Sequence, residues 1–257
     1  MNQSFYIGAV GAQQQLYHLN VHGDNIANVN TYGYKANKSY FAALLYQNWP
    51  GVEAELPKGV GTRMIKTSTD YSQGAPEETG RALDFYIEGN GFFGLVDLAT
   101  GEVTFTRNGA FIMSQREEST GEVDENGDPV LDEDGNPVTE RVFYLGDNEG
   151  RFVLSERGGL IRLDEYGDED ELPIGIFDYI NYDGMIRLDD TRYLPVAKNG
   201  NLWYGDGKLI RGYIERSNTD LAEEITKVIE AQRAYTAALK MMITSDEIEN
   251  TINNLRT

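Results

Sequence analysis

The sequence predicts an α+β protein in which N- and C-terminal helices form a coiled-coil layer and the central region is an antiparallel β-rich domain. Two observations support this prediction. Apolar residues recur at alternating steps of four and three near both ends of the chain, a spacing that keeps one stripe of a helix against a partner helix. Between these ends, short runs rich in β-branched and aromatic residues alternate with Gly, Asn and Asp, as in antiparallel β domains.

The N-terminal helix is predicted from its apolar spacing, and its surroundings are predicted from its lack of charge. Its apolar seam consists of Phe5, Ala9, Ala12, Leu16, Leu19, Gly23 and Ile26. Asp24 is the only fully charged side chain between positions 1 and 30, whereas Asn and Gln are abundant. Surface helices usually carry charged residues opposite their apolar stripe. We therefore expect other protein to cover this helix on nearly all sides.

The same helix is predicted to be weak in isolation. Gly8, Gly11 and Gly23 each cost a helix interior roughly 1 kcal/mol relative to Ala. A helix of about 22 residues is also close to the length at which isolated helices are marginal in water. We expect the segment to be frayed in the monomer and to become ordered on packing against other helices.

A connecting arm is predicted over residues 33–75. Gly33 is expected to end the first helix, and residues 35–46 fit either a short second helix or an extended arm. Pro and Gly between positions 50 and 61 then break regular structure. The expected domains are an inner, polymerising helical domain over 1–32 and 217–257, the arm over 33–75, and an outer β-rich domain over 76–216.

The β-rich domain carries most of the negative charge. Residues 117–171 contain 19 acidic and 4 basic side chains, a local balance of −15 in a chain whose net charge is −20. An acidic insertion is predicted near 117–140, where DENGDPVL at 124–131 is nearly repeated by DEDGNPVT at 132–139. Hairpin turns with solvated carboxylates are favoured over weak divalent-cation binding, because the glycines and acidic residues do not follow calcium-loop spacing.

The C-terminal helix is predicted to be long. N-cap candidates at its start are Ser217, Asn218, Thr219 and Asp220, and Asp220 and Glu223 have the spacing of a capping box. Its apolar seam consists of Leu221, Ile225, Val228, Gln232, Tyr235, Leu239 and Met242. No Pro or Gly follows, so a helix that continues to the end of the chain would be about 55 Å long and must project or join a bundle.

Charge and hydropathy exclude several classes of partner. The acidic balance disfavours binding to nucleic acid or to anionic membranes. No run of about 18 apolar residues is available to cross a membrane. The N-terminal segment lacks the basic and apolar stretches of a cleavable signal peptide, so export would need a route that does not cleave this end.

The sequence offers no convincing catalytic, cofactor-binding or metal-binding residues. GNGFFG at 89–94 matches a dinucleotide-binding pattern, but a strand-like segment follows it instead of the required helix, which favours a turn. His18 and His22 are the only histidines, and spacing identifies no third metal ligand, so a helix-interface role is favoured. With two histidines and no cysteine, nucleophile–base pairs have almost no candidates, and we predict that the protein is not an enzyme.

Three separated blocks resemble the flagellar basal-body rod and hook-basal-body protein family. YIGAVGAQQQLYHLNVHGDNIANVNTYGYK resembles its N-terminal signature, with His22 and Gly23 as departures from the pattern. QGAPEETGRALDFYIEGNGFF and FTRNGAF are similar to its central motif, and IERSNTDLAEEITKVIEAQRAYTAALKMM is similar to its C-terminal signature. The positions that match the family motifs include Asn25, Asn28, Asn30, Gly33, Gln232, Arg233 and Tyr235.

This resemblance implies a structural subunit that is exported uncleaved by the flagellar type III apparatus. It would polymerise through the two seams, with copies of itself and other rod or hook proteins, into a hollow axial shaft outside the cytoplasmic membrane, without cofactors. The chain length and FAALLYQ at 41–47 resemble distal-rod members more than proximal-rod members. A proximal-rod or hook paralogue is the alternative within the family, and a standalone coiled-coil adhesin or fibre module is the alternative outside it.

The predicted weakness of the N-terminal helix can be tested by limited proteolysis of the dilute chain. We expect residues 1–30 to be cleaved faster than the β-rich middle, because the helix depends on contacts with other subunits. Mass spectrometry of the early fragments would identify the cleavage sites. Equal resistance of the first thirty residues and the middle would show that the helix is self-sufficient.

Overall fold

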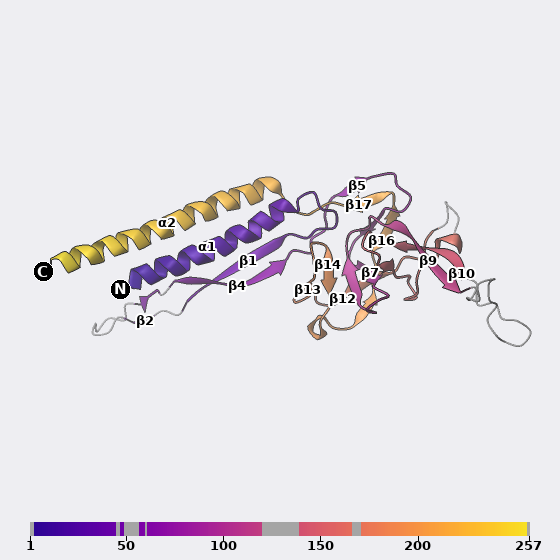
Figure 1. Ribbon diagram of the computed structural model, residues 1–257, viewed down its shortest axis with the longest axis horizontal. Coiled ribbons are helices and arrows are strands. Elements are labelled where there is room, and N and C mark those ends of the chain that lie inside the picture. The colour runs from indigo at the N-terminus through magenta and orange to yellow at the C-terminus, as the bar shows by residue number, and fades with distance from the viewer. Residues whose placement is uncertain are drawn as a thin grey trace, which may run out of the picture. The chain divides into compact units, whose positions relative to one another are not determined.

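The chain forms two compact units of different composition. The computed structural model describes residues 3–44, 47–48, 57–59, 61–119, 139–165 and 171–255 (Figure 1). The helical unit comprises Met1–Asn30, Lys35–Ser72 and Ser217–Thr257, and the strand unit comprises Thr31–Tyr34 and Gln73–Arg216. Long helices from both termini and a central region of antiparallel strands confirm the predicted α+β class.

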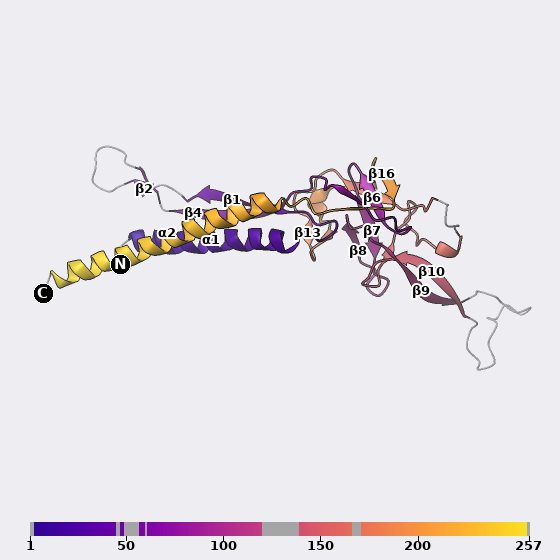
Figure 2. The same cartoon turned by 90° about the horizontal axis from the view of Figure 1, so that it is seen from above.

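Helices from opposite ends of the sequence pair in the helical unit. Helix α1 spans Gln3–Ala27, helix α2 spans Leu221–Asn254, and the two lie side by side (Figures 1 and 2). The predicted N-cap is confirmed, because the Asp220 carboxylate accepts hydrogen bonds from the backbone amides of Ala222 and Glu223. Within the described ranges, no helix is apolar over a stretch long enough to cross a bilayer.

A two-stranded sheet packs against α1 in the same unit. Its strands are β1 (Asn37–Ala43) and β4 (Thr62–Thr69), and a second short pair is formed by β2 (Gln47–Asn48) and β3 (Pro57–Lys58). Thr, Ile, Tyr and Phe in β1 and β4 favour a pleated conformation. The sequence allows either a short helix or an extended arm over residues 35–46, and the structure has the extended strand β1 there.

The first helix ends earlier than the sequence predicts. Helix α1 stops at Ala27, where the Asn28 side-chain amide donates a 3.1 Å hydrogen bond to the Asp24 carbonyl and satisfies an acceptor of the last turn. Gly33 instead lies in the strand unit with a φ of +72°, and a Cβ there would lie 2.3 Å from the Asn108 nitrogen. Close packing of the backbone, and not helix termination, therefore requires this glycine.

A nine-stranded antiparallel sheet forms the frame of the strand unit. The strand order along its main path is β13, β14, β8, β7, β11, β10 and β9, and β12 pairs with both β7 and β15. Two further antiparallel pairs join β16 to β6 and β17 to β5. The strands are β5 (Pro76–Glu78), β6 (Phe85–Glu88), β7 (Phe92–Val96), β8 (Val103–Thr106), β9 (Ile112–Ser119), β10 (Thr139–Gly146), β11 (Phe152–Val153), β12 (Ile176–Tyr179), β13 (Ile186–Arg187), β14 (Arg192–Leu194), β15 (Leu202–Tyr204), β16 (Lys208–Arg211) and β17 (Tyr213–Glu215).

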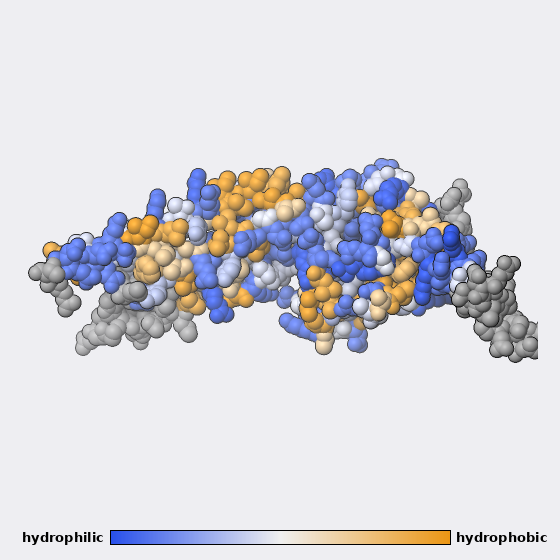
Figure 3. Space-filling model, in the orientation of Figure 1, coloured by the Kyte–Doolittle hydropathy of each residue, from blue (hydrophilic) through white to orange (hydrophobic). Residues whose placement is uncertain are grey.

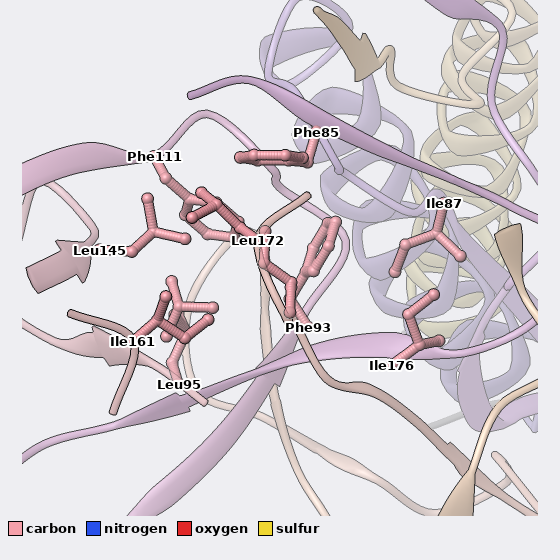
Figure 4. Close-up of a cluster of buried hydrophobic side chains, with 11 residues drawn as sticks. Phe85, Ile87, Phe93, Leu95, Phe111, Leu145, Ile161, Leu172 and Ile176 are labelled. Atoms are coloured by element: carbon pink, nitrogen blue, oxygen red, sulfur yellow. The ribbon is translucent and has the colours of Figure 1, made fainter. Parts of the chain in front are cut away.

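Large apolar side chains from several strands form the core of this unit. Phe93 and Phe111 meet edge to face with ring centroids 5.1 Å apart, a favourable arrangement for aromatic pairs. Figure 4 shows the surrounding side chains pointing toward one another. The cluster consists of Phe85, Ile87, Phe93, Leu95, Phe111, Leu145, Val153, Ile161, Leu172, Ile174 and Ile176.

The glycine-rich segment at 89–94 is a turn between strands. Gly89 and Gly91 have φ values of +104° and +119°, in the left-handed region that favours glycine. Strand β7 then forms a hairpin with β8, which confirms the turn interpretation. Strands β9 and β10 also pair, but residues 120–138 between them, which include the two predicted acidic loops, lie outside the described residues.

A buried ion pair connects distant parts of the strand unit. Arg107 Nη1 lies 3.2 Å from Glu215 Oε2, and both side chains are almost completely buried. Arg107 also donates hydrogen bonds to the carbonyl oxygens of Ile87 and Gly89, and the other Glu215 oxygen accepts one from the Gly74 amide. Because these bonds compensate the lost hydration of both charges, the pair can exist in the interior.

Replacing Glu215 with Ala should destabilise the strand unit by about 3–5 kcal/mol, because Arg107 would remain as a buried and uncompensated cation. Urea unfolding followed by near-ultraviolet circular dichroism measures this loss. Glu77→Ala is the control, since Glu77 is paired with the exposed Arg216 and should contribute about 1 kcal/mol or less. Similar losses in both variants would contradict the proposed importance of the buried pair.

Candidate functional site

Glycines allow the two terminal helices to approach closely. A Cβ on Gly8 would lie 2.8 Å from Met242 Cγ and 3.2 Å from the Ala238 carbonyl oxygen, and one on Gly11 would lie 3.8 Å from Ala238 Cβ. The first of these distances is too short for any larger residue unless the neighbouring atoms move. The glycines that weaken α1 as an isolated helix therefore serve its packing on α2.

A buried polar contact joins the opposite end of this helix pair. His22 Nδ1 lies 2.5 Å from Glu224 Oε2, and both side chains are buried. The Asn25 side-chain amide donates a 3.2 Å hydrogen bond to the same oxygen, and Lys227 Nζ lies 3.5 Å from Oε1. Glu224 also lies in the first turn of α2, where helix amides favour negative charge. The buried carboxylate is thus compensated from both helices.

His18 continues this polar contact along α1. Its Nε2 lies 2.8 Å from His22 Nε2, and its ring meets Phe41 edge to face with centroids 5.1 Å apart. Burial, together with the neighbouring His22 and Lys227, lowers the pKa of His18 below its usual value. His22 therefore lies at the helix interface that the sequence predicts, whereas the contacts of His18 are to His22 and to Phe41 of β1.

A second face of α1 uses amide side chains to contact the β1–β4 sheet. Gln14 is buried and accepts a 2.7 Å hydrogen bond from the Met64 amide. Asn25 accepts a 2.8 Å bond from the Asn37 amide and donates a 2.9 Å bond to the Asn37 carbonyl. Buried amides need such partners, and these contacts explain part of the abundance of Asn and Gln in α1.

A third face of α1 is exposed although it is apolar and nearly uncharged. Tyr6 is 54% exposed, Leu16 is 46% exposed and Tyr17 is 42% exposed. Asp24 is the only fully charged residue in this helix. A helix face that remained in solvent would normally carry several charges. This face has the composition of a surface that is covered in an assembly.

The residues of the two predicted seams differ in their exposure. On α1, Ala12 is buried, Phe5, Ala9, Leu19 and Ile26 are half-buried, and Leu16 and Gly23 are exposed. On α2, Val228, Tyr235, Leu239 and Met242 are half-buried, whereas Leu221, Ile225 and Gln232 are exposed. The role of these residues in polymerisation stays a prediction.

Helix α2 exposes further apolar residues that sequence analysis does not identify as part of a seam. Hydrophobic atoms gather over the N-terminal part of α2 in Figure 3. Met241, Ile248, Ile252 and Leu255 follow one another at steps of seven, four and three, so the spacing in the sequence could have identified them. The additional residues are Ile229, Met241, Ile243, Ile248, Ile252 and Leu255.

The family-motif residues of the C-terminal block lie mostly on the open side of α2. Gln232 and Arg233 line a shallow groove of about 440 Å³ with Thr236, Ala237 and Lys240, and Tyr235 is half-buried. In the N-terminal block, Asn25 and Asn28 are buried and hydrogen-bonded, whereas Asn30 is exposed. Sequence analysis does not identify Gln14 or Glu224, because only the pairing of distant segments shows their partners.

Comparisons with known proteins find relatives along the whole chain. Residues 5–35 match the family described as flagella basal body rod protein, and residues 210–255 match the flagellar basal body rod FlgEFG protein C-terminal family. The flagellar basal-body rod protein FlgG of Buchnera aphidicola subsp. Schizaphis graminum is 30% identical over 99% of this chain and 100% of its own length. The FlgG proteins of Bacillus subtilis and Caulobacter vibrioides are 31% and 29% identical, over 100% and 99% of both chains.

Replacing Glu224 with Ala should loosen α1 from α2, because His22 and Asn25 lose a shared buried acceptor. We expect a loss of about 2–4 kcal/mol in the free energy of unfolding of the helical unit. Hydrogen exchange of the α1 amides measures the change. Glu223→Ala is the matched control, since Glu223 is exposed and its carboxylate pairs with the Lys227 ammonium at 2.7 Å. Equal exchange in the two variants would exclude a special role for Glu224.

Proposed function

This chain belongs to the flagellar basal-body rod protein family, and we propose that it polymerises through its terminal helices into the hollow axial drive shaft of the flagellum, as a distal-rod subunit. Members of this family are structural rather than enzymatic. Membership also implies that the chain assembles with other rod subunits.

The exposed and nearly uncharged face of α1 is the observation that best supports polymerisation through the helices. Tyr6, Leu16 and Tyr17 remain exposed although α2 and the β1–β4 sheet already contact other faces of α1. Helix α2 also exposes apolar residues, but it carries many charged residues as well. When different surfaces of identical subunits pair without closing a ring, the product is a helical filament.

The number of exposed apolar residues is sufficient for a strong contact. Complete burial of a large apolar side chain contributes about 1.5–3 kcal/mol. The exposed residues on α1 and α2 are already partly covered, so each gains only a part of this amount on assembly. Several such residues acting together are needed to offset the loss of translational and rotational freedom. We therefore expect polymerisation to depend on concentration.

The distal position, the partners and the route of export are parts of the same proposal. Full-length similarity to proteins named FlgG supports a distal-rod subunit, with a proximal-rod or hook paralogue as the alternative. We infer export by the flagellar type III apparatus, assembly with copies of this chain and with other rod or hook proteins, and a final location in the basal body outside the cytoplasmic membrane.

The two parts of the chain would then have different roles. We assign the terminal helices to an inner, polymerising layer, because both helices expose apolar residues and α1 is also nearly uncharged. We assign the β-rich region to an outer layer, because residues 117–171 carry a strong negative charge that is best hydrated.

Replacing Leu16 with Asp should prevent polymerisation while the strand unit remains folded, because assembly would bury an unpaired carboxylate. Sedimentation and electron microscopy at high protein concentration measure assembly, and near-ultraviolet circular dichroism monitors the strand unit. Leu98→Asp is the matched control, since Leu98 is a leucine of similar exposure in the strand unit and should not affect assembly.

Two results would contradict the proposed assembly mode. The first is normal filament formation by the Leu16→Asp variant. The second is a closed dimer or trimer of the unmodified chain that does not grow with concentration, as expected for a standalone adhesin or fibre module.

A further inference from the structure

Two histidines of α1 face each other at a distance that suits a shared metal ion. His18 and His22 are one helical turn apart, and their Nε2 atoms are separated by 2.8 Å. A metal ion binds a histidine nitrogen at about 2.0–2.1 Å. An ion at that distance from both nitrogens would make an N–metal–N angle close to about 90°. This is the angle between neighbouring ligands in square-planar or octahedral coordination, whereas a tetrahedral ion would need nitrogens about 3.3 Å apart.

The two imidazole rings meet at an angle and not end to end. Their centroids are 4.4 Å apart. With ring bonds of about 1.3–1.4 Å, a straight N–H···N contact would place the centroids about 5.1 Å apart. The shorter separation and the 76° angle between the ring planes show that the two rings are not aligned end to end along the line between the nitrogens.

The surroundings orient His22 in the way that metal-binding histidines are usually oriented. Its other nitrogen, Nδ1, contacts the Glu224 carboxylate at 2.5 Å. A carboxylate in this position holds the ring, fixes the proton on Nδ1 and leaves Nε2 available as a ligand. Asn25 and Lys227 contact Glu224 in turn. The carboxylate that orients the histidine is therefore fixed by both helices.

His18 supplies the more accessible side of the pair. Its ring packs against Phe41, which limits rotation, but the residue is only half-buried, whereas His22 is buried. Additional ligands can therefore reach an ion from the side of His18.

We propose that His18 and His22 form a binding site for a divalent late transition-metal ion, Cu²⁺ or Ni²⁺, with Glu224 as the residue that orients His22. Imidazole ligands at about 90° are characteristic of these ions. Among the described residues, no group of three His, Cys, Asp or Glu side chains is arranged to hold a metal, so the described part of the chain supplies two ligands. Water completes the coordination.

Metal binding at this site would stabilise the packing of α1 on α2. The two ligands belong to α1, but the residue that orients one of them belongs to α2. An ion that binds the packed helices more tightly than the separated ones shifts the equilibrium toward the packed state. This inference does not depend on the proposed function, because a single dilute chain contains all the protein groups involved.

The test is Cu²⁺ binding by the full-length chain, measured by titration calorimetry in the presence of excess Mg²⁺, which occupies exposed carboxylates. We expect one Cu²⁺ per chain and pulsed electron paramagnetic resonance signals from two imidazole nitrogens. These are the only histidines, and the sequence contains no cysteine, so no other side chain can produce this signature. His18→Gln and His22→Gln should each abolish the two-imidazole signal and the stoichiometric binding.

Glu224→Gln should weaken Cu²⁺ binding tenfold to hundredfold, as expected for a residue that orients a metal ligand. Glu223→Gln is the matched control and should bind like the unmodified chain. Circular dichroism of each variant checks helix content, and the half-buried His18 provides a variant that should fold even if His22→Gln does not. Absence of stoichiometric binding in the unmodified chain, or its persistence in His18→Gln, would overturn the proposal.

Discussion

The close antiparallel packing of α1 on α2 is the constraint on which the rest of the helical unit depends. At one end, Gly8 leaves room for Met242, and at the other end the buried contact between His22 and Glu224 fixes the alignment of the helices. The residues of each pair are more than two hundred positions apart in sequence, so forming these contacts costs the conformational entropy of closing the intervening chain into a loop. The chain in between lowers this cost by folding into a core of its own.

Helix α1 has three faces, of which two pack within its own chain and one is exposed. One face contacts α2, a second contacts the β1–β4 sheet through Gln14 and Asn25, and the third exposes Tyr6, Leu16 and Tyr17. The third face exposes large apolar side chains although the helix carries almost no charge. The proposed polymerisation would use this division, because the same helix would hold its own chain together and present a contact surface to neighbouring subunits.

Several residues of the family motifs perform identifiable structural tasks. Asn25 links α1 to both α2 and β1, Gly33 fits against the Asn108 backbone, and Asn28 satisfies a carbonyl at the end of α1. His22 departs from the family pattern described above but makes the buried contact with Glu224 at one end of the α1–α2 pair.

The sequence by itself determined the fold class, the N-cap region of α2 and the turn at residues 89–94, because helix periodicity, caps and glycine turns are local properties. The family followed from the resemblance of three separated motif blocks. The sequence did not determine the end of α1, the strands of the predicted arm, or the partners of Gln14 and Glu224. Those features depend on contacts between residues far apart in sequence. Only the tertiary structure decided which faces of the helices were covered and which remained exposed, because burial is a property of the packed chain and not of its local pattern.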